Sequence, residues 1–167
     1  MIGKLQTFRV HVRQVTWRHV AASLLVVLAP AGVLAAKDHT ILSANEIKWS
    51  PGPASLPKGA QAAVLYGDPT KDGPFAMRLK LPDGYQIPPH SHPKPEVVTV
   101  ISGTFRLGMG EKADPKAAEN LKAGSFFAFP AGMVHHAAAD GETVVQLNST
   151  GPWNIEYVNP KDDPRRQ

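Results

Sequence analysis

The chain has 167 residues, a length that suits one compact domain, and a formal net charge of +4. Four of its 18 basic residues precede residue 21, where no acidic residue occurs, so the remaining 14 basic residues match the 14 acidic ones. A nearly neutral body without a basic stripe argues against nucleic-acid binding. Because cysteine is absent, disulfides, thiolate metal sites and a lipoprotein anchor are excluded.

The N-terminal segment has the composition of an export signal. Its basic residues lead into AASLLVVLAPAGVLAA at positions 21–36, an apolar run interrupted by Pro30. This run is shorter than the about 20 apolar residues that cross a bilayer. The VLA sequence before Ala36 fits a signal-peptidase site, and no twin arginine occurs. We therefore expect residues 1–36 to be a cleaved signal peptide, with a short uncleaved anchor as the alternative. The mature protein is expected to be periplasmic or secreted, without stable membrane insertion.

After residue 36, short apolar or alternating runs lie between closely spaced prolines and glycines. In the run FAMRLKL at 75–81, every second side chain is apolar, whereas Arg78 and Lys80 point the other way. Many short strands with frequent turn signals predict a β-sandwich or barrel. The expected strands lie at residues 62–67, 75–81, 96–102, 104–110, 125–130, 133–139, 143–149 and 153–158.

The mature chain shows no internal repeat and no interdomain linker. We expect an N-terminal arm or loop at 37–59, one domain at 60–158 and a flexible C-terminal tail at 159–167. Within the domain, Gly103 is expected to form a tight hairpin turn between the strands on either side. One helical turn is expected at 114–121, where Asp114 can cap and Pro115 occupies the first helical position.

The segment GYQIPPHSHPKPEVVTVISG, residues 84–103, contains candidate metal ligands. His90 and His92 lie two residues apart, and an extended strand places such residues on the same side. Glu96 opens the next expected strand close to these imidazoles. Imidazole and carboxylate ligands without thiolate suit Fe, Mn, Zn, Ni or Cu. Taken alone this pattern is a weak indication, because a polar loop rich in histidine and proline has the same composition.

A second segment, GSFFAFPAGMVHH at 124–136, completes a resemblance to the cupin family. The first cupin motif, G-x5-HxH-x3-4-E-x6-G, is matched at every spacing by Gly84, His90, His92, Glu96 and Gly103. The second, G-x5-PxG-x2-H-x3-N, is matched by Gly124, Pro130, Gly132 and His135, with Ala139 in place of the final asparagine. The resemblance covers roughly residues 60–150.

This resemblance implies an all-β fold, an antiparallel jelly-roll barrel of six to eight or more short strands. It also implies one divalent transition-metal ion per chain (Fe, Mn or Zn), held inside the barrel by His90, His92, Glu96 and His135. About two coordination positions would stay open for water, dioxygen or substrate, with Glu96 as ligand and candidate catalytic base. The change at Ala139 is expected to remove a hydrogen bond near the site rather than the metal.

Cupins include dioxygenases, oxalate-degrading enzymes, isomerases and non-enzymatic binding or zinc-sensing modules, so the fold alone leaves the function open. The first hypothesis is an extracytoplasmic metal-dependent oxidoreductase of the oxygenase type that acts on a small organic molecule. The alternative is a non-enzymatic sensor or binding module for a metal or small ligand. The family resemblance also implies a homodimer formed through edge strands.

Other side chains carry weaker expectations. His136 should face away from the metal because neighbouring strand residues alternate, and His39 should lie at the surface. Arg78 and Arg106 are interpreted as exposed strand cations, with anion binding as the alternative, and Tyr66 and Tyr85 as candidate proton donors near the site. The expected barrel lining comprises Phe105, Leu107, Met109, Phe126 or Phe127, Phe129, Met133 and Gln146.

Overall fold

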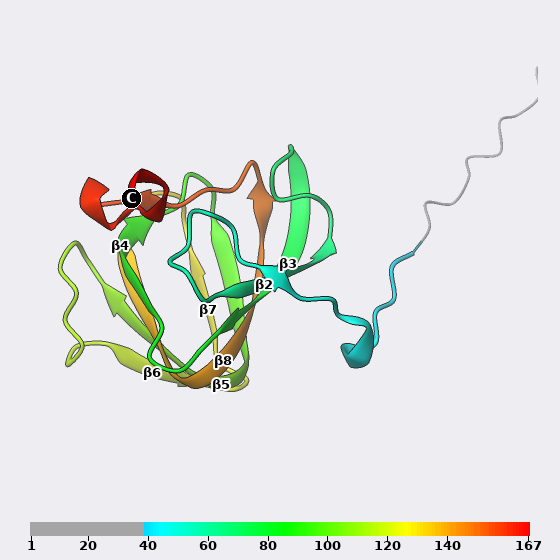
Figure 1. The fold of residues 1–167 in the computed structure, drawn as a ribbon, viewed down its shortest axis with the longest axis horizontal. Helices are drawn as coiled ribbons and strands as arrows, with labels where there is room; N and C mark the ends of the chain where they lie inside the picture. The colour runs from blue at the N-terminus through cyan, green and yellow to red at the C-terminus, as the bar shows by residue number, and fades with distance from the viewer. Residues whose placement is uncertain (1–38) are drawn as a thin grey trace, which may run out of the picture. The chain divides into compact units, whose positions relative to one another are not determined.

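The computed structural model describes residues 39–167, which form one unit built largely of β-strands (Figure 1). The expected signal peptide lies outside these residues. Between residues 39 and 167, no helix is both long and apolar enough to cross a membrane. This part of the chain contains three 3₁₀ helices, η1 (Ala44–Glu46), η2 (Pro160–Asp162) and η3 (Pro164–Arg166). Its nine strands are β1 (Ser50–Pro51), β2 (Gln61–Tyr66), β3 (Gly73–Leu81), β4 (Gln86–Ser91), β5 (Glu96–Met109), β6 (Glu119–Lys122), β7 (Phe126–Phe129), β8 (His135–Gly151) and β9 (Glu156–Tyr157).

All strand pairs are antiparallel, and the long strand β8 joins the two parts of the sheet. On one side the order of neighbours is β1-β2-β3-β8-β4-β9. On the other side β5 pairs with β8 along most of its length, while β6 and β7 pair with β5. The expected all-β antiparallel jelly-roll fold is thus confirmed.

The alternation of side chains along β3 shows how these strands build the core. Phe75, Met77, Leu79 and Leu81 are buried, whereas Arg78 and Lys80 are half-buried on the opposite face. The same side of the sheet receives Val98 and Val100 from β5 and Val145 and Leu147 from β8. Each such buried aliphatic side chain stabilises the fold by about 1.5–3 kcal/mol. The predicted apolar face of this strand is confirmed.

The prediction of a tight hairpin turn at Gly103 is wrong. Residues 96–109 form the single strand β5, which bends against β8 at register shifts on either side of Ser102. Gly103 has φ of +77°, and a Cβ there would lie 2.5 Å from the Glu142 carbonyl oxygen. Glycine therefore permits a close approach between two continuous strands. The strands expected at 133–139 and 143–149 are likewise parts of one strand, β8.

Two further segments differ from expectation. The Asp114 side chain accepts a hydrogen bond from the Lys116 amide, as a cap would, but the chain then makes a turn and enters β6 instead of a helix. Pairing of β6 with β5 overrides the local helical preference of DPKAAENL. In the segment expected as a strand at 153–158, only Glu156–Tyr157 pairs, with β4.

The ends of the described unit are more ordered than expected. In the N-terminal arm, β1 pairs with β2 and Leu56 is buried in the core. The expected flexible tail at 159–167 instead forms η2 and η3. There the Arg165 guanidinium donates to both Asp163 carboxylate oxygens, to Asn154 Oδ1 and to the Ile155 carbonyl. Hydrogen bonds from Arg165 lower the pKa of the buried Asp163 carboxyl, so the tail is held by a charged contact.

Replacing Arg165 with alanine is expected to release this tail. Amide hydrogen exchange over residues 159–167 should accelerate about tenfold, because several charge-assisted hydrogen bonds are lost. Arg166→Ala is the matched control, since this neighbouring side chain is exposed and contacts Asp163 only at 3.6 Å. Equal exchange rates in the two variants would contradict the anchoring role of Arg165.

Candidate metal centre

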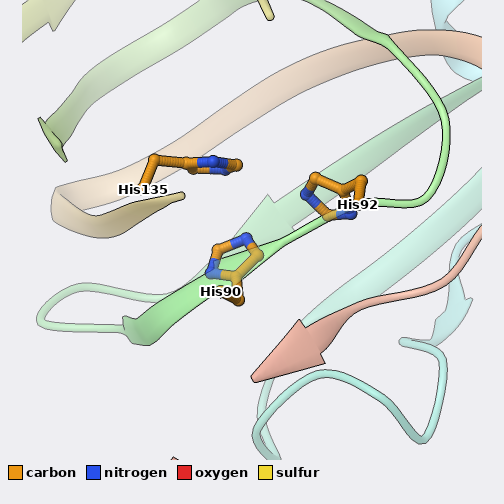
Figure 2. A group of neighbouring side chains, drawn as sticks. All are labelled: His90, His92 and His135. Atoms are coloured by element: carbon orange, nitrogen blue, oxygen red, sulfur yellow. The ribbon is translucent and has the colours of Figure 1, made fainter. Parts of the chain in front are cut away.

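Three histidines from two strands meet inside the barrel. His90 lies in β4, His92 follows its last residue, and His135 begins β8, where it pairs with His90. One nitrogen from each of the three imidazoles lies within 4.8 Å of the others, and the rings face a shared space (Figure 2). All three residues are at most 4% exposed. The structure thus brings His135 beside two histidines that lie 43 and 45 positions earlier in the chain.

Backbone carbonyl groups hold each imidazole in one orientation. His90 Nδ1 donates to the Pro88 carbonyl at 2.7 Å, His92 Nδ1 to the Asn154 carbonyl at 2.8 Å and His135 Nδ1 to the Met133 carbonyl at 3.0 Å. A carbonyl can only accept, so the proton resides on Nδ1 and the Nε2 lone pair remains available. This is the arrangement in which histidine ligates a metal.

Glu96 supplies a carboxylate to the same space. It is the first residue of β5 and only 4% exposed. Its Oε1 lies 3.0 Å from His135 Nε2, and its Oε2 lies 3.5 Å from His92 Nε2. With the protons on Nδ1, these are contacts between acceptors, and Oε1 has no hydrogen-bond donor among the described residues. Buried acceptors that converge in this way call for a cation between them, so the residues fit a divalent metal ion.

The histidines enclose a small apolar chamber. Its volume is about 30 Å³, and its walls are mainly aliphatic and aromatic. The chamber is lined by the four candidate ligands together with Leu56, Leu79, Leu81, Ile87, Val98, Phe105, Phe127, Ala137, Val145, Leu147, Trp153 and Ile155. Burial in this surrounding, reinforced by the neighbouring imidazoles, lowers the pKa of His90 well below its usual value. Burial also lowers the pKa of His92, so both rings favour the neutral form that binds metal.

The predicted lining is partly correct. Phe105 and Phe127 line the chamber, and Phe129 packs against the His135 ring with centroids 5.1 Å apart. Leu107 is buried in the core. The prediction of Phe126 or Phe127 is met by Phe127, whereas those for Met109 and Met133 are wrong, because both side chains are exposed and neither lines the chamber. The prediction that Gln146 lines the chamber is also wrong, because its Oε1 accepts a hydrogen bond from Arg78 away from the chamber.

The other polar candidates lie outside the chamber. Tyr66 and His39 are exposed, and Arg106 donates to the Pro115 carbonyl. Tyr85 donates its hydroxyl to the Pro57 carbonyl, and burial raises its pKa, so it is a structural hydrogen-bond donor. Ten of the sixteen lining residues belong neither to the candidate ligands nor to the predicted lining, among them Leu56 and Trp153. Both lie outside the two motifs, and only the tertiary fold brings them to the site.

Ala139, where the motif has asparagine, is buried in the core. Its amide donates to the Tyr85 carbonyl at 2.8 Å, and its carbonyl accepts from the Gly84 amide at 3.1 Å. Ala137, two residues earlier, lines the chamber. The methyl group at position 139 therefore packs in the apolar core, and the backbone supplies the hydrogen bonds there.

His136 is directed away from the chamber, as alternation predicts. Its Nε2 accepts a hydrogen bond from the Asp114 amide at 3.3 Å, and it borders a surface groove with Arg106 and Pro115. The ring packs on Gly108, where an added Cβ would lie 2.1 Å from His136 Nε2. The two adjacent histidines thus have separate surroundings, and the His136 ring packs between Gly108 of β5 and the 111–118 loop.

Gly108→Ala is accordingly expected to destabilise the fold by about 1–3 kcal/mol, because the new methyl group overlaps the His136 ring. Urea unfolding measures this change. The double variant Gly108→Ala/His136→Ala should regain most of the loss, since the overlapping ring is gone. A double variant no more stable than Gly108→Ala would show that the overlap is not the cause.

Comparison with known proteins identifies relatives of this chain. A family model described as "Cupin domain" matches residues 77–150. Germin-like protein subfamily 2 member 1 of Arabidopsis thaliana is 36% identical over 89 residues, 53% of this chain and 40% of that protein. Germin-like protein 3-1 of Oryza sativa subsp. japonica is 32% identical over 130 residues, 71% of this chain and 57% of that protein. The chain spans about half the length of the curated relatives it matches.

Solved structures agree on the fold. The polyketide cyclase RemF from Streptomyces resistomycificus has a TM-score of 0.57 and 18% identity, over 76% of this chain and 90% of that one. KdgF from a Halomonas species has a TM-score of 0.53 and 20% identity, over 68% of this chain and 96% of that one. At sequence identities this low, the similarity shows only that the strands are arranged in the same fold.

Proposed function

The chain belongs to the cupin superfamily, and from this premise we propose that it is a mononuclear-metal oxidoreductase of the oxygenase type. Its substrate would be a small organic molecule that reaches the metal through a small polar group. The observation that carries this proposal is the convergence of three Nε2 atoms and one carboxylate in a buried chamber whose lining contains no further metal ligand. An octahedral ion held by four protein ligands keeps about two positions for exchange.

The chain's own residues would have distinct roles in this site. His90, His92 and His135 would hold the ion through Nε2, with their Nδ1 protons kept on backbone carbonyls. Glu96 would hold it through a carboxylate oxygen, and it is the candidate to accept a proton from a bound substrate. A bound iron, manganese or copper ion supplies Lewis acidity and redox chemistry. The apolar wall formed by residues such as Leu81, Val98 and Phe127 would exclude bulk water.

Metal content together with oxygen uptake tests this proposal. The protein purified from its natural compartment is expected to contain about one equivalent of iron, manganese or copper and to consume oxygen with a subset of small acids, alcohols or diketones. Elemental analysis measures the first quantity, and an oxygen electrode measures the second. A fully metal-loaded protein that consumes no oxygen across such a screen would overturn the oxygenase assignment.

The small chamber favours a second candidate function, a module that binds a metal or a small ligand without turnover. A volume of about 30 Å³ accommodates an ion's small ligands with little additional space. In that case one equivalent of tightly held, redox-silent zinc without a labile water is expected. The same elemental analysis therefore separates the two candidates.

We also propose that the protein acts outside the cytoplasm, because residues 1–36 have the charge pattern and apolar length of a signal peptide. The mature N-terminus is then expected near Ala36 or Lys37. N-terminal sequencing of protein recovered from the periplasm or medium tests this, and an intact Met1 on cytoplasmic protein would contradict it.

A further inference from the structure

Trp153 is a chamber residue that belongs to neither sequence motif. Its indole stacks on the His92 imidazole, with centroids 4.6 Å apart and an interplanar angle of 19°. Phe75 meets it edge-on at 6.4 Å, and the Trp153 amide donates to the Pro69 carbonyl at 2.8 Å. The next residue, Asn154, supplies the carbonyl that orients His92. These contacts fix the indole directly beside a candidate metal ligand.

The indole N–H lacks an acceptor. Trp153 Nε1 is buried and has no hydrogen-bond partner among the described residues. Buried tryptophan N–H groups usually find an acceptor, because an unpaired buried donor is costly. The edge-on ring of Phe75 offers only a weak acceptor for an N–H group. An orphaned donor in a side chain that lines a ligand chamber is therefore explained best by a ligand.

The chamber restricts what that ligand can be. Among its lining residues, Trp153 is the one side chain with a hydrogen-bond donor that is not a candidate metal ligand, and none is lysine or arginine. A ligand charge would have to be balanced by the metal itself. The volume of about 30 Å³ leaves space for a group of a few non-hydrogen atoms.

We propose that Trp153 is a ligand-binding residue that donates its indole N–H to a small hydrogen-bond-accepting group bound at the metal. This inference rests on the proposed function, since it places the accepting group at an open coordination position. It deepens that function by naming the substrate class: molecules whose metal-bound part has a few non-hydrogen atoms and a free lone pair. The site would then select ligands by their ability to accept a hydrogen bond, and not by pairing their charge with a charged side chain of the protein.

Azide, a three-atom anion with a free terminal lone pair, is a suitable probe for the zinc-loaded protein. Trp153→Phe retains an aromatic ring beside His92 but removes the N–H donor. We expect this variant to bind zinc as the unsubstituted protein does and to bind azide about tenfold more weakly, as calorimetry measures. Trp49→Phe is the matched control, because Trp49 packs against Lys80 and does not line the chamber.

A second readout does not depend on any substitution being tolerated. In ¹H–¹⁵N spectra of the unsubstituted zinc-loaded protein, azide should shift the Trp153 indole resonance and leave that of Trp49 in place. Unchanged azide affinity in Trp153→Phe, or an unmoved Trp153 indole resonance on azide saturation, overturns the role of Trp153 alone. A protein that binds no zinc, or zinc but no azide, overturns the open metal site and the proposed function with it.

Discussion

Replacing His92 with alanine is expected to abolish stable metal binding while the barrel stays folded. The change removes one of three imidazoles whose nitrogen atoms lie within 4.8 Å of one another, and three remaining ligands hold an ion far less tightly. Folding should persist, because the core is an apolar cluster spread over β2 to β8 and the chain has no disulfide to lose. Loss of the buried ring should cost about 1–3 kcal/mol.

Elemental analysis after dialysis and thermal unfolding by circular dichroism measure the two effects. Metal content should fall from about one equivalent to below a tenth. His136→Ala is the matched control, since it removes another buried imidazole, one that accepts a hydrogen bond from the Asp114 amide outside the chamber. Retention of metal by His92→Ala would contradict the ligand assignment. A His92→Ala chain unfolded at room temperature would mean that the metal is structural, which weakens the proposed catalysis.

The metal-free protein is expected to lose stability steeply as the pH falls below about 6.5. Burial lowers the folded-state pKa of both His90 and His92, so the unfolded chain binds protons at a pH where the folded chain does not. Above pH 6.5, which is the pKa of histidine in the unfolded chain, these two groups therefore do not change the free energy of unfolding. It decreases from pH 6.5 down to the folded pKa values, by up to about 1.4 kcal/mol per pH unit for each histidine.

Urea unfolding of metal-free protein at pH 7.5, 6.5 and 5.5 measures this slope. His90→Ala should reduce the slope, because one titrating group is removed, whereas His39→Ala should leave it unchanged because His39 is exposed. Bound metal should compensate for this loss of stability until, at low pH, the imidazoles become protonated and release the metal ion. A stability that is flat between pH 7.5 and 5.5 would contradict neutral, buried imidazoles.

The strand pattern could be predicted from local spacing, and the resemblance carried by the two spaced motifs named the candidate ligands. Alternation places Phe75 and Leu79 on the core side of β3, and it turns His135 toward the chamber and His136 away from it. The segment DPKAAENL shows the limit of local reasoning. Its helical preference is overridden when Glu119–Lys122 pairs with β5, a contact that local composition does not report.

Residue types at fixed spacing are a property of the sequence alone; they determined the β-class and the cupin resemblance, and that resemblance implied the four candidate ligands. Only the tertiary structure decided what surrounds those ligands. Closure of the barrel brings Glu96 within 3.0 Å of His135 Nε2, although Glu96 begins β5 and His135 pairs with Met109 at its far end. Packing of the 151–157 segment places Trp153 on His92. Such contacts depend on register and on chain crossings over tens of residues, so no local pattern encodes them.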